Sequence, residues 1–223
     1  MSAKTQVHFL RHGEPIGGDI FRGSTDVALS EHGRWQFNQR VRRCLVNAQL
    51  QGVISSPLQR CLASADELAN QFDLDCDVQS AWREIDYGDW ENRLVRDVLA
   101  ESPKQVKQMS EQPLAFCAPN GEHVAEFQAR LIAAWQQLLA RWRGAEVVVV
   151  CHGGVMRVLA QHLLGLEPAA MNRLSIPYAG WMHFCVHHGA DQAGSAKNWV
   201  SLQAMDGSEL VNTQLSAEVA IGR

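Results

Sequence analysis

The stretch EVVVVCHGGVMRVLAQHLLG, residues 146–165, decides the fold class of this sequence. Its first part is a continuous β-branched run, which is typical of a parallel strand buried on both faces of a sheet. Gly153 and Gly154 then open a segment with helical periodicity, and Gly165 stops it. A buried strand that leads directly into a helix indicates an α/β protein.

The same order of strand and helix recurs along most of the chain. Strands are predicted at residues 6–10, 52–56, 73–78 and 146–152, and helices at 29–50, 56–72, 121–142 and 153–165. Ser30 is expected to cap the first helix, and Ser56 and Pro57 to begin the second. Residues 181–188 and 198–205 have the pattern of two late edge or hairpin strands. We therefore predict an α/β fold with a mostly parallel central sheet and helices on both faces.

One segment, residues 86–120, interrupts this rhythm. It holds short helical pieces that Pro103, Pro113 and Pro119 break. We interpret it as an inserted helical cap segment that covers the active site. Residues 1–223 are accordingly predicted to form a single domain.

Composition narrows the class of protein. The 223 residues are 46% hydrophobic and 20% charged, as in an ordinary globular protein. A net charge of −4 provides no basic field for nucleic acid or an anionic membrane. No apolar run approaches the roughly 20 residues that a bilayer span needs, and the N-terminal residues lack the apolar core of a secretory signal. The six cysteines form no CxxC pair, so reduced core thiols in a cytoplasmic protein are expected.

Polar side chains follow the predicted parallel strands. Arg11 and His12 end the first strand, Arg60 lies in the first turn after the second, Glu84 follows the third, and His152 ends the fourth. Ligands of open α/β sheets bind beyond the carboxyl ends of the strands. These five side chains are therefore predicted to converge on one edge of the sheet.

This combination of groups suits phosphoryl transfer. Guanidinium groups match phosphate oxygens, and the helix after Gly153 offers backbone N–H groups to an anion. Positive neighbours keep a histidine neutral, so that its imidazole can attack phosphorus. A carboxylic acid can protonate the leaving oxygen and later activate water. Positioning and charge stabilisation can then drive the reaction without a metal.

Four motifs carry a family resemblance: LRHGEP (10–15), SSPLQRCLASA (55–65), REIDYGDWE (83–91) and VVVVCHGG (147–154). In this order they resemble the histidine phosphatase superfamily, also called phosphoglycerate mutase-like, from about residue 6 to about residue 165. The resemblance implies that His12 is the phosphorylated nucleophile and Glu84 the proton donor. It implies that Arg11, Arg60 and His152 hold the phosphoryl group.

A further block, FRGSTDVALSEHG (21–33), implies that Gly23 and Ser24 contribute to the phosphate or substrate pocket. REIDYGDWE and PNGEHVAEFQARL (119–131) also resemble the α-ribazole phosphatases of cobalamin assembly. The lysine- and arginine-rich segment shared by cofactor-dependent mutases is not found. Two departures concern substrate contacts: Gly17 stands where many relatives have asparagine, and His123 where serine is common.

The resemblance thus implies a metal-independent phosphomonoesterase that uses a phosphohistidine, needs no cofactor, and hydrolyses α-ribazole 5′-phosphate or a similar small phosphate ester. A phosphoglycerate mutase or a broad-specificity sugar-phosphate phosphatase stays open, as does a non-catalytic phosphate-binding module. An oligomer also stays open. His12 and His152 have no third residue at a spacing suited to a metal, so no metal site is predicted.

For Glu122 and for three aromatic residues, two interpretations stay open. Glu122 either reaches the site or favours the dipole of its helix. Trp82, Tyr87 and Trp90 either wall the site or pack the insertion onto the sheet. His187 and His188 are predicted on a surface strand. The solvated face of the first helix is predicted to carry Arg34, Arg40, Arg42 and Arg43.

Overall fold

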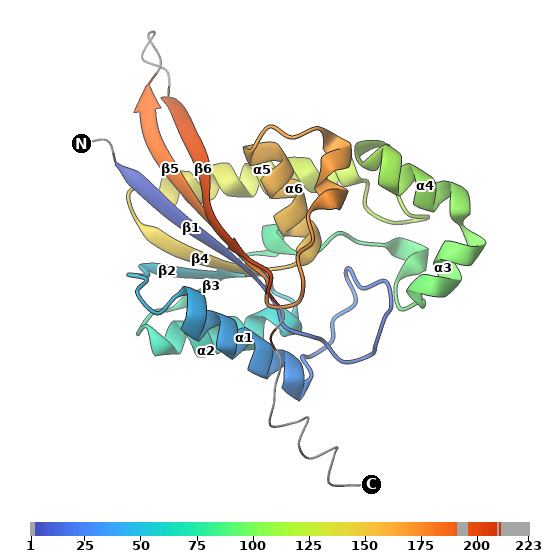
Figure 1. Ribbon diagram of the computed structural model, residues 1–223, viewed down its shortest axis with the longest axis horizontal. Helices are drawn as coiled ribbons and strands as arrows, with labels where there is room; N and C mark the ends of the chain where they lie inside the picture. Colours follow the sequence, from blue (N-terminus) through green and yellow to red (C-terminus); the bar gives the residue numbers. More distant parts are fainter. Residues whose placement is uncertain (1–2, 191–195, 209, 211–223) are drawn as a thin grey trace, which may run out of the picture.

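A computed structural model describes residues 3–190, 196–208 and 210 as an α/β fold around a six-stranded sheet (Figure 1). The strand order is β3-β2-β4-β1-β5-β6. The strands are β1 (Lys4–Arg11), β2 (Gly52–Ser55), β3 (Cys76–Val78), β4 (Glu146–Cys151), β5 (Trp181–Ala190) and β6 (Ala196–Asp206). The helices are α1 (Glu31–Cys44), α2 (Gln59–Gln71), α3 (Val95–Glu101), α4 (Pro103–Glu111), α5 (Val124–Arg141) and α6 (Gly153–Leu163).

The first four strands run parallel and end together. β3, β2, β4 and β1 pair in parallel, while β5 runs antiparallel to β1 and forms a hairpin with β6. Arg11 of β1 lies opposite Cys151 of β4, and Ser55 of β2 lies opposite Val150. The predicted mostly parallel sheet and its late hairpin are confirmed. This register brings the residues after β1, β2 and β4 to one edge.

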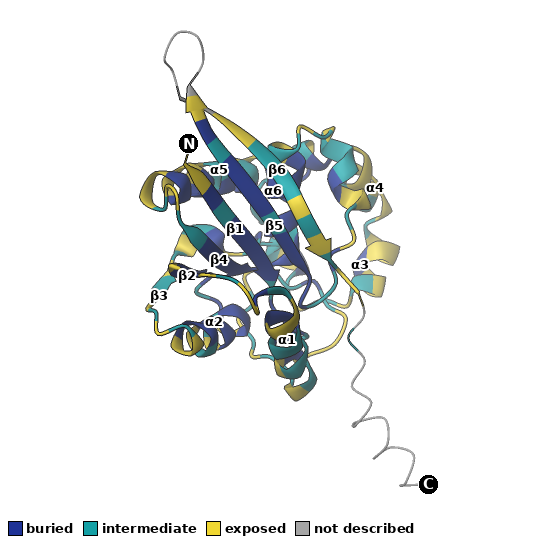
Figure 2. Ribbon diagram, turned by 60° about the vertical axis from the view of Figure 1, so that its left-hand side comes forward, coloured by how far each residue is buried: buried dark blue, intermediate teal, exposed yellow. Residues whose placement is uncertain are grey.

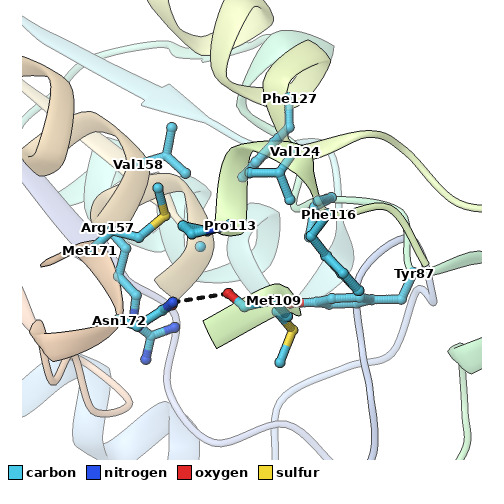
Figure 3. A pocket seen from close by; sticks show the side chains of 12 residues that line it. Tyr87, Met109, Pro113, Phe116, Val124, Phe127, Arg157, Val158, Met171 and Asn172 are labelled. Carbon is cyan, nitrogen blue, oxygen red and sulfur yellow. Dashed lines mark hydrogen bonds between the residues drawn. The ribbon is translucent and has the colours of Figure 1, made fainter. Parts of the chain in front are cut away.

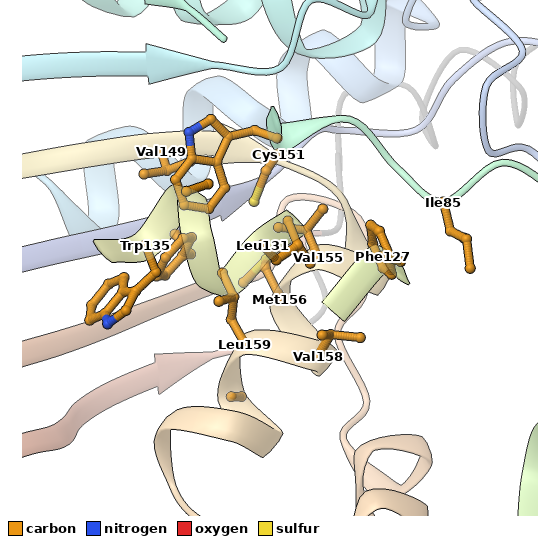
Figure 4. Close-up of a cluster of buried hydrophobic side chains, with 14 of the residues drawn as sticks. Ile85, Phe127, Leu131, Trp135, Val149, Cys151, Val155, Met156, Val158 and Leu159 are labelled. Atoms are coloured by element: carbon orange, nitrogen blue, oxygen red, sulfur yellow. The ribbon is translucent and has the colours of Figure 1, made fainter. Parts of the chain in front are cut away.

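Helices cover both faces of the sheet because successive strand residues point to opposite sides. Val7 and Phe9 belong to a buried cluster with α5 and α6, whereas Leu10 belongs to the cluster with α1 and α2. Figure 4 shows part of the first cluster, in which Leu131 and Leu159 pack below β4. Figure 2 shows the central strands buried and the helices buried on their inner sides only.

The start of α2 differs from the prediction. The helix begins at Gln59, and its N-cap, Leu58, makes no side-chain capping bond. Ser56 does not cap the helix, because its hydroxyl lies 2.7 Å from a ring nitrogen of His152. Ser30, in contrast, caps α1 as predicted by accepting a hydrogen bond from the Gly33 N–H.

Two expectations about surface residues were wrong. Arg40 is fully buried, and its guanidinium pairs with Asp206 at the end of β6. His188 is also buried, 4% exposed, with a ring nitrogen 2.7 Å from the Thr5 hydroxyl. Both side chains find partners on elements distant in sequence, which local polarity does not reveal.

The segment 86–120 lies beyond the carboxyl ends of the parallel strands, where Figure 1 shows α3 and α4. Its ends are tied together, because Glu122 N–H donates to Asp86 O and Asp89 N–H donates to Pro119 O. Trp90 is buried in the core cluster of α5 and α6, so this aromatic residue packs the segment onto the body of the protein. None of the helices that the structure describes combines the length and apolarity needed to cross a bilayer.

Candidate active site

His12 lies directly after β1 at the centre of the strand edge. Its backbone N–H donates to Cys151 O at 3.0 Å, which joins the ends of β1 and β4. Its ring Nδ1 is 2.7 Å from Gly13 O. A carbonyl oxygen only accepts, so Nδ1 carries the proton and Nε2 keeps its lone pair. Gly13 is required here, since a Cβ would come within 1.8 Å of Gly33 O.

His12 is held in its neutral form. Its side chain is buried, with 4% exposure. Burial lowers the pKa of His12 well below the ordinary histidine value, and the charges of Arg11 and Arg60 lower the pKa further. The unprotonated Nε2 therefore persists at neutral pH.

Arg11 extends from the last residue of β1 into the cavity. Its Nη1 donates to Ile176 O at 2.6 Å, and its guanidinium carbon lies 4.2 Å from the Tyr178 ring centroid. The Arg11 Nε is buried and has no hydrogen-bond partner among the described residues. A Cβ on Gly153 would lie 3.2 Å from this nitrogen, so glycine keeps the helix start open beside it.

His152 packs against His12 with Arg60 behind it, and neither His152 nor Arg60 lines the cavity. Arg60 is fully buried and donates to Gly23 O and Thr25 O, both at 2.7 Å. Its Nε donates to His152 Nδ1 at 3.3 Å, so His152 presents its Nε2 proton to Ser56. Burial lowers the pKa of His152 well below the ordinary value, and Arg60 and His12 add to this effect.

Gly23 and Ser24 also lie outside the cavity lining. Their backbone N–H groups donate to the Glu91 carboxylate at 3.0 and 2.9 Å. Burial alone would raise the pKa of Glu91, but hydrogen bonds from Thr25, Tyr87 and Ser24 outweigh it and lower the pKa. The loop therefore binds an internal carboxylate and orients Arg60, and its predicted contact with substrate stays a prediction.

Glu84 lines the cavity opposite the start of α6. Its Oε2 accepts from Gly154 N–H at 3.0 Å, and its Oε1 from Ile85 N–H at 3.1 Å. A Cβ on Gly154 would come 2.3 Å from Glu84 Oε1, so glycine permits this contact. The helix N-terminus thereby aims the carboxylate at the cavity.

Glu122 stabilises the loop that carries Glu84. It pairs with Arg130 at 2.7 Å, and Arg130 also donates to Ala81 O and Arg83 O at 2.8 and 3.1 Å. Neither interpretation of Glu122 from the sequence predicted its pairing with Arg130. His123 caps α5, since its Nδ1 accepts from Ala125 N–H.

Three cavity residues escaped the sequence prediction. Arg22, Arg157 and Tyr178 line the cavity together with Arg11, His12 and Glu84. Arg22 stands in the quoted FRGST motif, and Arg157 lies one helical turn beyond Gly153, on the same side of α6. Tyr178 precedes β5, whose antiparallel direction returns its start to the edge where β1 ends.

Residues 3–190, 196–208 and 210 contain no group of three His, Cys, Asp or Glu side chains placed to hold an ion. Two buried donors in the cavity are instead suited to an anion. The Nε atoms of Arg11 and Arg22 both lack hydrogen-bond partners among the described residues, and both arginines line the cavity.

Comparison with known proteins identifies the family. The model of the histidine phosphatase superfamily (branch 1) matches residues 7–198, so the chain belongs to this superfamily. It is 30% identical over 162 residues to phosphoserine phosphatase 1 of Hydrogenobacter thermophilus, which covers 71% of this chain and 75% of that protein. It is 32% identical over 176 residues to "Probable phosphoglycerate mutase GpmB" of Yersinia pestis, which covers 77% and 80%.

Solved structures agree with this family. A mycobacterial glucosyl-3-phosphoglycerate phosphatase superposes with a TM-score of 0.79 at 26% identity, over 92% of this chain and 100% of that one. The α-ribazole phosphatase of Shigella flexneri shares the fold, with a TM-score of 0.72 at 20% identity over 93% and 100%. The predicted superfamily is confirmed, and so is the prediction of a phosphatase-type enzyme. At the level that the comparisons reach, the protein is a phosphatase or a mutase.

Proposed function

We propose that this protein is a metal-independent phosphomonoesterase that works through a phosphohistidine at His12 and hydrolyses α-ribazole 5′-phosphate or a similar small phosphate ester. One observation carries the proposal. The neutral His12 ring lies in a cavity where two buried guanidinium donors lack partners among the described residues. A nucleophile beside unsatisfied cations is suited to a phosphate dianion.

Charge in the cavity favours that dianion. Arg11, Arg22 and Arg157 line it, and Arg60 lies one layer behind against His152. Glu84 is the only carboxylate among the described lining residues. Backbone N–H groups at Gly153 and the following turn of α6 add a positive helix end. The phosphoryl group is thus held by Arg11, with Arg60 and His152 supporting His12 and completing the positive surroundings.

In the first step His12 Nε2 attacks phosphorus in line with the departing oxygen. The N–P bond forms as the P–O bond of the ester breaks. Glu84, protonated at this stage, gives its proton to the departing alkoxide. The arginines neutralise the charge that spreads over the equatorial oxygens.

In the second step water hydrolyses the phosphohistidine. The Glu84 carboxylate accepts a proton from the attacking water, the new P–O bond forms, and the N–P bond breaks. The electron pair returns to His12 Nε2, and inorganic phosphate leaves. Because Glu84 serves both steps, it must alternate between its two protonation states.

The α-ribazole assignment is supported by the motifs REIDYGDWE and PNGEHVAEFQARL. A mutase is the second candidate, favoured by the likeness to the probable mutase of Yersinia. A mutase must return the phosphoryl group to a substrate hydroxyl and depends on a bisphosphate primer. Phosphate release without any primer distinguishes hydrolysis from that reaction.

The first test is phosphate release from α-ribazole 5′-phosphate, with EDTA present, against sugar phosphates and phosphoglycerates. We expect His12→Ala to reduce turnover by at least about 10⁴-fold, since no other group can form the covalent intermediate. Rapid quenching should trap phosphate on His12 in the wild-type protein. His162→Ala, an exposed change on α6, is the control and should retain activity. Substantial turnover by His12→Ala would contradict the nucleophile assignment.

The role of Glu84 has its own test. Glu84→Gln keeps the shape but removes the transferable proton, so we expect about a 10²-fold loss on alkyl phosphates. An activated aryl phosphate should lose much less, because its leaving group departs without protonation. Equal losses on both ester types would show that Glu84 is not the acid.

A further inference from the structure

We infer that an apolar pocket beside the catalytic cavity is a subsite for the leaving group, and that it selects phosphate esters whose alcohol carries an aromatic ring. This inference rests on the proposed function. It narrows the substrate class by the chemistry of the pocket. Most of the residues that line the pocket lie outside the catalytic cavity.

The pocket adjoins the catalytic cavity. Tyr87, Gly154 and Arg157 line both hollows. A substrate whose phosphoryl group faces His12 therefore has its leaving group directed across these shared residues. Figure 3 shows Tyr87 and Arg157 on opposite sides of this pocket.

The remaining walls are almost entirely apolar. They come from the loop at Ile85, the cap segment, α5, α6 and the 3₁₀ helix Pro168–Arg173. The members are Ile85, Met109, Pro113, Phe116, Val124, Phe127, Val158 and Met171. Arg157 is the only charged residue among the described lining residues, and its Nε is already bonded to Leu174 O at 3.0 Å. Apart from this guanidinium, the pocket offers a leaving group mainly apolar contacts.

The far wall is held in place by hydrogen bonds. Asn172 Nδ2 donates to Met109 O at 3.0 Å and to Ser110 O at 3.2 Å, which joins the end of α4 to the 3₁₀ helix Pro168–Arg173. Figure 3 draws the bond between Asn172 and Met109. These bonds brace the far wall, which limits the ordering that binding has to supply.

The size of the pocket fits one ring. Its volume is about 140 Å³. An apolar cavity of about 150 Å³ accepts benzene. The thioethers of Met109 and Met171 add polarizable contacts that favour aromatic edges. An aromatic ring joined to the phosphate by a short linker is therefore the expected occupant.

The test compares 2-phenylethyl phosphate with ethyl phosphate, two alkyl esters with similar leaving groups. The wild-type kcat/KM should favour the phenylethyl ester by about tenfold or more, because only that ester buries a ring. Met109→Gln makes the wall polar, and Met109→Trp fills the pocket. Both variants should bring the ratio close to one. α4 has no buried residue, so neither change should prevent folding, and circular dichroism verifies this.

Met205→Gln is the matched control, because this exposed methionine lies on β6 and does not line the pocket. It should leave the ratio at the wild-type value. Hydrolysis of both esters by the wild-type protein without preference would overturn the subsite and leave the proposed function standing. An undiminished ratio in both Met109 variants would also overturn it. Failure to release phosphate from any ester would overturn the proposed function itself.

Discussion

Two buried arginines, one in each of the helices that cover the same face of the sheet, have opposite electrostatic surroundings. Arg40 of α1 and Arg60 of α2 are both fully buried. Arg40 pairs with the Asp206 carboxylate and donates to Ala179 O at 2.8 Å. Arg60 donates to two backbone carbonyls and to the His152 ring, and none of its hydrogen-bond partners among the described residues is a carboxylate.

The difference separates a charge that is paired within the fold from one that the proposed function assigns to the active site. At the corner of α1 and β6, Asp206 neutralises Arg40, so that region is complete as folded. At the strand edge, no carboxylate among the described hydrogen-bond partners neutralises Arg60, and burial makes such an unpaired charge unfavourable. A bound phosphate dianion would compensate that charge. On the proposed function, the site would exchange folding stability for affinity toward an anion.

Removal of the functional charge should give the largest effect. Arg60→Met should lower kcat/KM about 10³-fold, equivalent to about 4 kcal/mol, because a fixed cation no longer stabilises the transferring phosphoryl group. Steady-state kinetics on an aryl phosphate measures this loss. Arg34→Met, at an exposed position of α1, serves as the control. A loss of less than tenfold would mean that Arg60 is structural, like Arg40.

Removal of the structural charge should act on folding. Arg40→Met should lower the free energy of unfolding by about 3 kcal/mol, since it leaves Asp206 without its buried partner. Urea denaturation measures this change. The double variant Arg40→Met with Asp206→Leu should recover much of the loss.

Arg43→Met provides the matched control for this corner. Arg43 also contacts Asp206, at 3.0 Å, but its side chain is 59% exposed. Its loss should change stability by less than about 1 kcal/mol. Equal destabilisation by the Arg40 and Arg43 variants would contradict the importance of burial at this corner.

Phosphate binding should distinguish the two regions without catalysis. Inorganic phosphate at 100 times its Kd should stabilise the wild-type protein by about 2.7 kcal/mol, because it binds the folded state only. Thermal unfolding with and without phosphate measures the gain. Arg40→Met should retain the gain, and Arg60→Met, which removes a charge one layer behind the cavity, should lose part of it. Full stabilisation of Arg60→Met would show that Arg60 does not contribute to phosphate binding.

The two regions should also differ in the pH at which they begin to lower the stability of the protein, and these are the smallest effects expected. The folded pKa of His12 lies below its unfolded value of about 6.5, so only the unfolded chain takes up a proton as the pH falls below about 6.5. His152 behaves in the same way. The strand edge should therefore begin to destabilise the protein just below that pH.

The corner of α1 and β6, where Asp206 pairs with Arg40, should lose stability only at lower pH. Burial would raise the pKa of Asp206, but hydrogen bonds from Ser208 and Arg40 outweigh burial and lower the pKa. Its contribution is present above the unfolded value of about 3.9 and is lost as the pH falls further. Unfolding free energies of the wild type and His12→Ala between pH 7 and pH 5 test the first region. The same slope in both proteins would contradict a buried neutral His12.

The order of elements was predictable from local sequence. Continuous β-branched runs and helical periodicity are local signals, so 146–165 alone indicated an α/β protein. The position of His12 after β1 was predictable for the same reason, since parallel strands end at one edge of a sheet. The start of α2 was not predictable from local sequence. The Ser56 hydroxyl hydrogen-bonds to His152, which lies 96 residues away in the chain.

The sequence by itself thus determined the sheet, its helices and which polar residues meet at the strand edge, because these follow from periodicity and from the ends of strands. Only the tertiary structure decided which buried arginine has a carboxylate partner. Arg40 and Arg60 look alike in a helix, and their difference arises from Asp206, which comes from the far end of the chain. The tertiary structure also brought Arg22, Arg157 and Tyr178 to one cavity. Such contacts depend on which distant segments pack together, and local patterns do not record that.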